Sequence, residues 1–409
     1  MTESLWLDEA TTALVAKMPL TDIFNKFLPG DFHPPLYYLL MKFWIGVFGS
    51  SEVSLRTPSL IFALLTVYLV YKMYGKVWAL LLATSPLLFY YAQEARMYSM
   101  AMFLVALAIF SFVKITKRSR VEWWVLFSIS LFLIGATDYV ALLILPVFWY
   151  LGRGFWKKLL ASHIILVGFG VLWLPYFLKQ FSSGLQVSAE SPAWSQLLGQ
   201  TSFKNLILIP VKFMIGRVSL DDKWLYVLVV ELVGLLLGYL VYRGREAPKI
   251  IWLWLLVPLA LGVVISFWVP VLSYFRFLFV LPAFYVLVAS GIKSKLFLWL
   301  VLGLNLLLIT YYLLIPRFHR EDWRAAAIAI GNDQVIFPAD SQKEALIYYR
   351  KGGQIVTEPS GKRVWLSRYV WQVFDPTDSV RKKIESLGYN KVSEYSFNGV
   401  EFYLYAYRN

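Results

Sequence analysis

Long apolar runs separated by short basic loops restrict the fold of this chain more than any other feature of its sequence. Because 59% of the residues are hydrophobic and only 16% are charged, the chain carries more apolar surface than a soluble domain can bury. The pattern predicts an all-α polytopic membrane bundle with about ten transmembrane helices. The expected spans are 57–73, 77–91, 97–113, 123–137, 139–151, 159–178, 224–242, 250–269, 275–290 and 296–315.

Basic residues fall on alternate loops between these runs, which is the positive-inside pattern of a membrane protein. They are Lys72, Lys76, Lys114, Lys117, Arg118, Arg120, Arg153, Lys157, Lys158, Arg243, Arg245, Lys249, Lys293 and Lys295. The net charge of +14 therefore reflects topology and not nucleic-acid binding. The outer face receives the first loop, residues 93–98, Asp138, residues 179–223 and the C-terminal part. We expect a catalytic loop at 1–55, a transmembrane domain at 56–316 and an extracytoplasmic domain at 317–409.

The first outer loop concentrates polar groups beside segments that are too short to cross a bilayer. Asp8 and Glu9 stand where a helix would begin, and His33 is followed by two prolines. The run 36–48 has 13 residues and contains Lys42, which favours a helix lying in the membrane interface. The loop is thus expected to hold a carboxylate pair and a histidine at the membrane surface. The segment 203–218, which contains Pro210 and three basic residues, is also expected to be interfacial.

After Pro316 the composition changes to that of a small α/β domain. Asp322 is the expected N-cap of a first helix. Strands are expected at 335–337, 363–367, 391–397 and 400–407, and further helices at 342–350 and 379–387. The domain is expected to be a structural cap or an acceptor-docking module. Its aromatic residues Trp365, Tyr369 and Trp371 suit a core better than sugar stacking.

Two residues are the first candidates for chemistry. A short Asp at a helix start, such as Asp8, can take the proton of an incoming hydroxyl, with Glu9 orienting it, or it can simply cap the helix. Arg96, at the outer end of two helices, presents the donors that suit a lipid phosphate. Its alternative is an interfacial anchor or an ion pair with Glu94.

The order of four motifs resembles a known enzyme superfamily. The motifs are W-x-D-E-A at 6–10, D-x-H-P-P-L-Y-Y at 31–38, S-E-x-x-x-R at 51–56 and Q-E-A-R-M-Y at 93–98. Together they resemble the polyprenyl-phosphate-sugar-dependent glycosyltransferases of the GT-C superfamily, in particular the protein O-mannosyltransferase and aminoarabinose-transferase branch. The resemblance is specific up to Tyr98 and looser afterwards.

The resemblance implies transfer of mannose or a similar hexose or pentose from a polyprenyl-phosphate donor to an extracytoplasmic hydroxyl, with inversion. Asp8 and Glu9 would be catalytic, and Arg96, Arg276 and His33 would bind the donor phosphate. Arg276 lies in R-F-L, where the family has R-Y-L, and His33 is equally compatible with a turn residue. The expected supporting residues are Gln93, Glu94, Tyr98 and Arg56. Asp138 stands where relatives often have His, so no role is assigned to it.

No cofactor is expected, because arginines already supply positive charge for a leaving phosphate. A divalent metal bound by Asp8, Glu9 and His33 is the alternative, although the chain has no cysteine and only three scattered histidines. No G-x-G-x-x-G, Walker or D-x-D motif indicates a nucleotide-sugar site. The expected setting is the plasma membrane, with the active site on the extracytoplasmic side.

Two alternatives stay open, together with one expectation about the start of the protein. The acceptor can be a protein or a lipid or cell-envelope glycan. A transporter or sensor with an outer domain is the alternative of another class, and Glu231, inside an apolar run, would be its functional carboxylate. Against it, the runs show no internal repeat. Finally, the family pattern places one helix before W-x-D-E-A, so the natural protein is expected to start upstream of Met1.

Overall fold

The structure, a computed structural model, describes residues 1–190, 199–350 and 352–408. Within this part the chain divides into two compact units. The first unit consists of Met1–Met18, Met41–Leu55 and Leu313–Asn409, and the second of Pro19–Leu40 and Arg56–Tyr312. Residues 191–198 of the expected outer stretch 179–223 lie outside the described residues. The expected domain boundaries at 55 and 316 separate segments by their side of the membrane, whereas the two units are groups of residues in contact. Those boundaries therefore stay a prediction.

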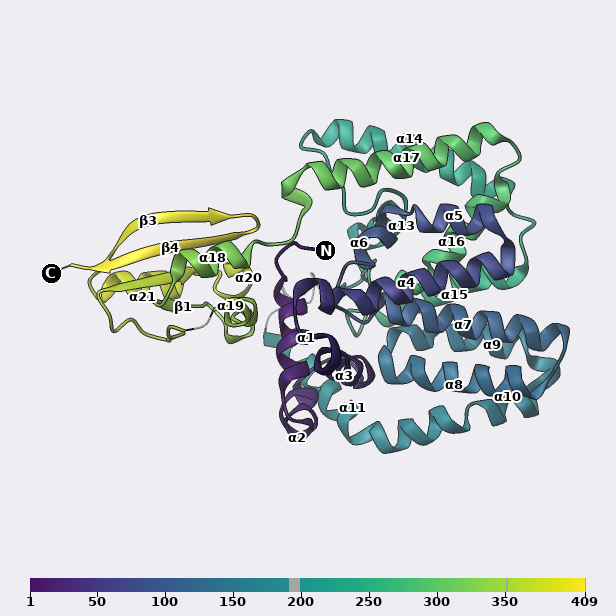
Figure 1. The fold of residues 1–409 in the computed structure, drawn as a ribbon, viewed down its shortest axis with the longest axis horizontal. Helices are drawn as coiled ribbons and strands as arrows, with labels where there is room; N and C mark the ends of the chain where they lie inside the picture. Colours follow the sequence, from purple (N-terminus) through teal and green to yellow (C-terminus); the bar gives the residue numbers. More distant parts are fainter. Residues whose placement is uncertain (191–198, 351, 409) are drawn as a thin grey trace. The chain divides into compact units, whose positions relative to one another are not determined.

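The expected apolar runs form helices, most of them close to the expected boundaries (Figure 1). The helices from residue 52 to residue 314, which include α13 in the segment expected to be interfacial and η4 in an expected loop, are α4 (Glu52–Tyr74), α5 (Lys76–Ala83), α6 (Pro86–Tyr91), α7 (Tyr98–Lys117), α8 (Val121–Thr137), η3 (Val140–Ile144), α9 (Leu145–Leu151), η4 (Arg153–Phe155), α10 (Trp156–Ser162), α11 (Ile164–Glu190), α13 (Phe203–Ile215), α14 (Lys223–Arg243), α15 (Lys249–Ile265), η5 (Leu278–Val280), α16 (Leu281–Gly291) and α17 (Lys295–Leu314).

The expected single span at 77–91 is wrong in detail, because it is two helices. The first helix ends at Ala83, with Thr84 as its C-cap, and Ser85 caps the second, since the Ser85 hydroxyl accepts a hydrogen bond from the Leu88 amide. Pro86 occupies the first position of α6, where its missing N–H costs nothing. An apolar run thus contains a local cap that divides it.

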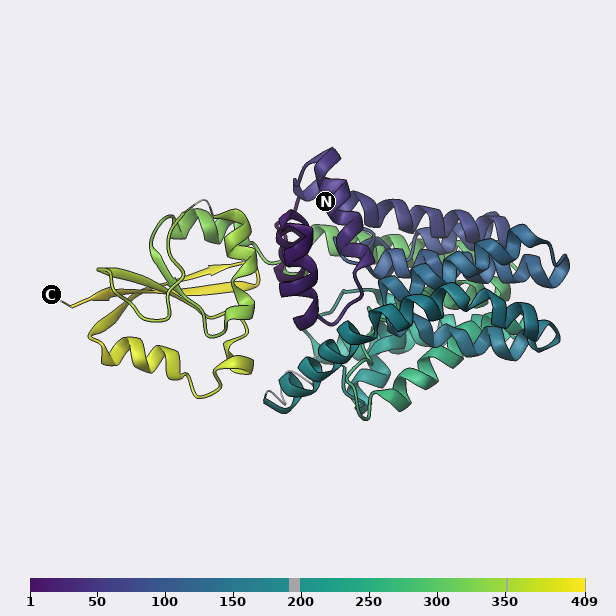
Figure 2. The same cartoon turned by 90° about the horizontal axis from the view of Figure 1, so that it is seen from below.

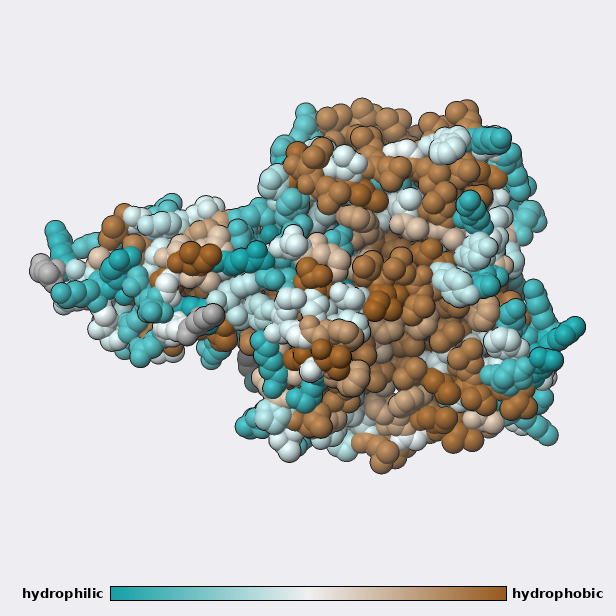
Figure 3. All heavy atoms as spheres, viewed as in Figure 1, coloured by the Kyte–Doolittle hydropathy of each residue, from teal (hydrophilic) through white to brown (hydrophobic). Residues whose placement is uncertain are grey.

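Among the described residues, five helices are long and apolar enough to cross a membrane, namely α4, α7, α11, α14 and α17. A bent pair, Val140–Leu151 with Arg153–Ser162, would make a sixth span. The expected number of ten stays a prediction. Figure 3 shows a broad apolar surface over the helices of the second unit, with hydrophilic residues near the helix ends.

Helices α14 and α16 approach each other backbone to backbone. A Cβ at Gly291 would lie 1.9 Å from the Leu240 carbonyl oxygen, and one at Gly244 would lie 2.3 Å from the Leu287 carbonyl oxygen. Only glycine permits this contact, which is typical of helix pairs in membranes. Helix α16 also packs against α5 and α15, and α7 packs against α8.

Short helices make up the segment that is predicted to be the first outer loop. They are α1 (Leu7–Lys17), α2 (Leu20–Asp22), the π-helical η1 (Ile23–Phe27), η2 (Leu28–Gly30) and α3 (Leu36–Phe48). Helix α3 has the predicted bounds. Helix α1 begins at Leu7, one residue before Asp8, and its N-cap is Trp6. Asp8 is therefore in the first turn of α1 and is not its cap.

The C-terminal part is the predicted α/β domain. Its elements are η6 (Pro316–Phe318), α18 (Trp323–Ile330), β1 (Gln334–Ile336), η7 (Asp340–Gln342), α19 (Glu344–Tyr349), β2 (Arg363–Ser367), α20 (Trp371–Phe374), α21 (Ser379–Ser386), β3 (Tyr389–Phe397) and β4 (Val400–Tyr407). The sheet order is β1-β2-β4-β3, in which β1 and β2 pair in parallel and the other two strand pairs are antiparallel. Asp322 caps α18 as predicted, since its carboxylate accepts from the Ala325 amide.

Helices cover both faces of this sheet (Figure 2). On one face Ile384 of α21 packs with Val364 and Tyr405. On the other, Trp323 of α18 contacts the ring of Phe402. The two faces follow from the alternation of side chains along β2 and β4. Trp365 is buried, which fits the core role expected for it.

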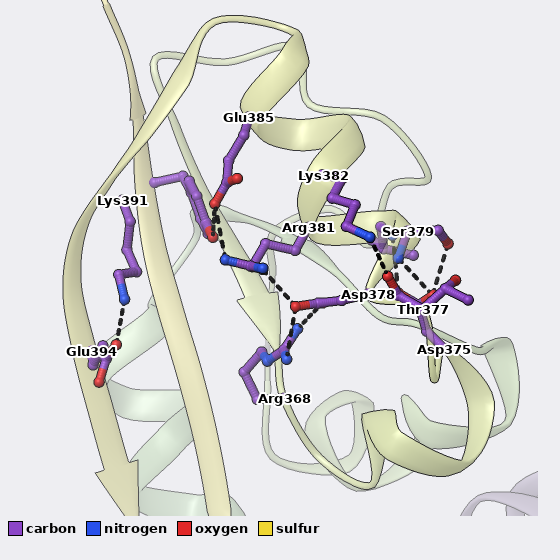
Figure 4. A network of polar contacts seen from close by, with 12 residues as sticks. Arg368, Asp375, Thr377, Asp378, Ser379, Arg381, Lys382, Glu385, Lys391 and Glu394 are labelled. Carbon is purple, nitrogen blue, oxygen red and sulfur yellow. Dashed lines mark hydrogen bonds and ion pairs between the residues drawn. The ribbon is translucent and has the colours of Figure 1, made fainter.

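An ion-pair network fastens α21 to the end of β2 (Figure 4). The Asp378 carboxylate accepts hydrogen bonds from both Arg368 and Arg381. The Arg368 side chain is only 4% exposed. Asp378→Asn would leave this guanidinium buried without its counter-ion, so we expect a loss of about 2–4 kcal/mol in domain stability. Hydrogen exchange of the β2 and α21 amides would measure it.

The matched control for this stability prediction is Lys391→Gln. Lys391 pairs with Glu394 at the surface of the same domain, where an ion pair contributes about 0–1 kcal/mol. Equal exchange protection in the Asp378 and Lys391 variants would show that burial of Arg368 does not matter.

Candidate active site

A largely apolar cavity of about 350 Å³ lies within the second unit. Its walls come from the turn before α3, the α8–η3 junction, helix α11 and the segment after α15. The lining residues are Phe32, His33, Asp138, Tyr139, Val140, Leu143, Phe177, Gln180, Phe181, Gly184, Leu185, Ile265, Trp268, Val269, Pro270, Val271 and Arg276. Two of the predicted phosphate-binding residues, His33 and Arg276, therefore line one cavity.

His33 is held by an acidic neighbour from its own motif. Its Nδ1 lies 3.5 Å from the Asp31 carboxylate, and both side chains are largely buried. The Tyr38 hydroxyl donates to the same carboxylate at 2.8 Å. Burial alone would raise the pKa of the Asp31 carboxyl, but His33, Arg96 and Tyr38 outweigh it and hold that pKa below its usual range. Asp31 is thus a negative charge placed among the predicted cations.

Gln180 of α11 fixes the backbone of the His33 turn. Its amide nitrogen donates to the carbonyl oxygens of Leu28 and His33, at 2.8 and 3.0 Å. Its amide oxygen accepts from the Tyr139 hydroxyl, which in turn accepts from the Trp173 indole. No motif identifies Gln180, so sequence reasoning missed it. The hydrogen bonds connect three walls of the cavity.

Asp138, to which the sequence assigned no role, also lines the cavity. It is buried, and one carboxylate oxygen accepts from the Val140 amide at 2.8 Å. Burial raises the pKa of the Asp138 carboxyl, and the charges of His33 and Arg276 only partly offset this rise. In the sequence, the position of Asp138 between two apolar runs was the feature that could have marked it as a site residue.

The turn between α6 and α7 carries Arg96. Both Arg96 and Tyr98 are 5% exposed, so the motif at 93–98 is an internal feature of the second unit. The Tyr98 ring lies 5.2 Å from that of Phe275. The Arg96 motif is therefore a direct neighbour of the segment that contains Arg276, as a shared phosphate site would require.

Arg217 is a cation near this turn that sequence reasoning did not select. Its guanidinium lies over the Tyr90 ring at 4.7 Å and donates to the Tyr274 hydroxyl at 3.0 Å. Gly216 (φ +67°), one position earlier, brings the chain against α6, because a Cβ there would lie 2.8 Å from Pro86. The feature of the sequence that could have marked Arg217 is a Gly-Arg pair directly after an apolar helix. Arg276 itself donates from Nη1 to the Pro270 carbonyl oxygen at 2.8 Å.

Asp8 and Glu9 belong to the first unit. Asp8 is partly exposed in the first turn of α1. Glu9 is fully buried, and its carboxylate lies 3.3 Å from Nε of Arg320. Burial raises the pKa of the Glu344 carboxyl on α19, and the charge of Asp8 adds to this rise. Glu344 and Arg320 are neighbours that the sequence did not indicate, because more than 300 positions separate them from α1.

The supporting residues also have definite places. Arg56 and Glu94 are buried. The Gln93 amide donates to the Phe89 carbonyl oxygen at 3.1 Å, and the Ser59 hydroxyl of α4 donates to the Arg96 carbonyl oxygen.

Glu231, the carboxylate of the transporter alternative, lies on an exposed side of α14 and outside the cavity lining. Within the described residues, no group of three or more His, Cys, Asp or Glu is arranged to hold a metal. The roles of the predicted site residues stay predictions.

Comparisons with known proteins give two findings. Residues 32–179 match the model of the dolichyl-phosphate-mannose-protein mannosyltransferase family. The structure is similar to ArnT from Cupriavidus metallidurans in the apo state, with a TM-score of 0.56 and 11% identity over 98% of this chain and 94% of that one. The same ArnT bound to undecaprenyl phosphate matches with a TM-score of 0.56, 12% identity and the same coverage. No protein with a curated description matches the sequence.

These similarities and the apolar helices define an integral membrane protein with the fold of a GT-C glycosyltransferase. The predicted resemblance to the GT-C superfamily of membrane glycosyltransferases is confirmed, in sequence over residues 32–179 and in fold over nearly the whole chain.

Proposed function

We propose that this chain moves a sugar, mannose or a similar hexose or pentose, from a polyprenyl-phosphate donor to an extracytoplasmic hydroxyl. The observation that carries the proposal is the cavity of the second unit. Its lining is mainly aliphatic and aromatic, as a prenyl chain requires, and it contains His33 and Arg276, which can contact a phosphate. ArnT, which has the same fold, binds undecaprenyl phosphate.

In the proposed reaction the acceptor oxygen attacks the anomeric carbon of the donor sugar and the carbon–oxygen bond to phosphate breaks, with inversion. Asp8 takes the proton of the acceptor hydroxyl, with Glu9 holding the helix that carries it. Negative charge develops on the departing phosphate, and Arg96, Arg276 and Arg217 stabilise it together with His33. The products are the glycosylated acceptor and polyprenyl phosphate. No cofactor is part of this proposal.

The neighbours of these cations have supporting roles in the proposal. Asp31 and Tyr38 orient His33, and Gln180 fixes the turn on which His33 stands. Gln93, Glu94 and Tyr98 shape the turn that holds Arg96, and Arg56 lies on the adjacent helix α4. The site is proposed to face the extracytoplasmic side of the plasma membrane.

The test supplies a radiolabelled polyprenyl-phosphate sugar to membranes that carry the chain. Label is then counted in the protein, lipid and water-soluble fractions. Label in protein would identify a protein hydroxyl as acceptor, and label in another fraction would favour a lipid or cell-envelope glycan. The absence of transfer from a panel of hexose and pentose donors, with the chain inserted and folded, would contradict the proposed function.

Blocking the cavity should weaken use of the donor. A Cβ at Gly184 of α11 would lie 3.4 Å from the Phe32 ring, which is ordinary contact, so Gly184→Leu can be accommodated while its outer carbons enter the cavity. We expect the donor KM to rise at least about tenfold, because the prenyl chain loses apolar contact area worth about 1.4 kcal/mol or more. Transfer measured against donor concentration gives this KM.

Gly170→Leu is the matched control for this variant. Gly170 lies on the same helix, is exposed, and has open space around its Cβ position. Both substitutions raise helix propensity equally. An unchanged donor KM in both variants would show that the donor does not occupy this cavity.

A further inference from the structure

The start of α1 is joined to the C-terminal domain by buried charges. Glu9 is 0% exposed and the Arg320 side chain is 2% exposed, with 3.3 Å between the Glu9 carboxylate and Nε of Arg320. Glu3 contributes a second carboxylate, 3.6 Å from Nη1 of Arg320, and also accepts from the Arg320 backbone amide at 3.1 Å. Both carboxylates therefore meet one guanidinium inside the first unit.

Arg320 is itself fixed by the sheet. The side chain of Asn398, in the turn between β3 and β4, donates to the carbonyl oxygens of Arg320 and His319, at 3.0 and 3.2 Å. The Asn398 carbonyl oxygen accepts from the Asp322 amide at 2.8 Å. The position of the guanidinium thus depends on the folded C-terminal domain and not only on the linker after α17.

A second group of contacts holds the other end of the first outer loop. Glu52, at the start of α4, accepts from Arg324 at 2.6 Å and from the Tyr349 hydroxyl at 3.0 Å. That hydroxyl also accepts from the Leu5 amide at 2.7 Å. Residues of α18 and α19 therefore bind both ends of the loop, and α1 packs directly on α19.

The Glu9–Arg320 pair has a geometric effect beyond stability. A fully buried ion pair is seldom the most stabilising choice, and its best supported use is to select one arrangement over its alternatives. Glu9 also accepts from the Trp6 amide at the helix start, so the pair fixes both the beginning of α1 and its rotation about its own axis. Since neighbouring residues of a helix point in directions about 100° apart, fixing Glu9 fixes the direction of Asp8.

We propose that the C-terminal domain is a positioning element for glycosyl transfer, in which Arg320, acting through Glu9, sets the orientation of Asp8. The inference rests on the proposed function, in which Asp8 is the base. Arg320 is a positioning residue and does not touch the substrate. A base that is displaced or rotated loses transition-state geometry, while the donor still binds.

The experiment measures kcat and donor KM in membranes for wild type, Arg320→Gln, Arg320→Lys and the double variant Glu9→Gln with Arg320→Gln. For Arg320→Gln we expect kcat to fall about 10- to 100-fold with donor KM unchanged within about twofold. Arg320→Lys keeps the charge and should recover part of kcat. The control Arg363→Gln removes an exposed ion pair with Asp333 in the same domain and should leave both constants unchanged.

The double variant separates positioning from folding. It removes both charges of the buried pair, and the remaining Glu3 carboxylate is partly exposed and lies 4.0 Å from His319. The first unit should therefore stay folded even if Arg320→Gln alone unfolds it. Its kcat is expected to stay low, because neutral side chains hold α1 less firmly. A wild-type kcat in the double variant would overturn the inference. Asp8→Asn, assayed in parallel, separates the two ideas. Transfer that is retained in Asp8→Asn would assign the base to another residue and remove the basis of the inference, and no transfer by wild type would contradict the proposed function. Loss in Asp8→Asn but not in the Arg320 variants contradicts only the role of Arg320.

Discussion

Asp8→Asn is expected to reduce sugar transfer by about 10²- to 10⁴-fold, the range that a general base contributes. Asparagine has nearly the same shape and keeps hydrogen bonding, but it cannot accept the acceptor proton. Asp8 lies in the first turn of α1 and is partly exposed, so it can reach an incoming hydroxyl, and a negative charge is stabilised at a helix start. The loss should appear in kcat with donor KM nearly unchanged, which a radiolabel assay over a range of donor concentrations measures.

Asp22→Asn is the control for this substitution. Asp22 lies in the same outer loop and forms an exposed pair with Lys26, which contributes little to stability. Its removal should leave transfer at the wild-type rate. Wild-type transfer by the Asp8 variant would assign the base to another residue and would reopen the reading in which Asp8 has no chemical role.

Arg276→Gln should lower kcat/KM by roughly 10- to 150-fold, which corresponds to about 1.5–3 kcal/mol for a lost charge-assisted hydrogen bond. Arg276 lines the cavity beside His33 and Asp138, and its segment contacts the Arg96 turn through Phe275 and Tyr98. Glutamine still donates a hydrogen bond but carries no positive charge, so the developing phosphate charge loses a partner. The effect should be similar for every sugar, because the phosphate is common to all donors.

Arg245→Gln provides the comparison for Arg276. Arg245 is an exposed arginine that pairs with Glu246 after α14 and is outside the cavity lining. Transfer by this variant should equal that of wild type. An Arg276 variant whose loss depended on the sugar would contradict phosphate binding and indicate a contact with the sugar itself.

Much of the local structure follows from the sequence, because short-range patterns determine it. Helix α3 and strands β2 and β4 have the predicted bounds, since apolar run length and period-2 alternation are read within a few residues. The break at Ser85 was missed because hydropathy alone does not distinguish a capped interruption from a continuous span. The grouping of 1–18 with 313–409 depends on contacts between distant segments, and no local pattern encodes them.

The candidate site was predictable to a similar extent. Charged residues within motifs, such as His33 and Arg96, could be selected because charge near apolar runs is costly and therefore conspicuous. Gln180 and Arg320 could not, because their importance comes from the partners that the fold gives them. Asp31 and Arg217 are intermediate cases. Asp31 lies within the motif at 31–38 and Arg217 within the expected interfacial segment 203–218, but only the geometry shows what each contacts.

The contacts that hold α1 also determine when this part of the protein can become ordered during its synthesis. The Leu5 amide finds its partner Tyr349 across 344 positions of sequence, and Glu9 must wait for Arg320. The segment 1–55 is therefore translated early but acquires its final partners only after the C-terminal domain has been synthesised. Contacts of such long sequence separation form late and slowly. A nascent or truncated chain would thus lack an ordered α1, and completion of the C-terminal domain would be the step that fixes Asp8 in the orientation needed by the proposed reaction.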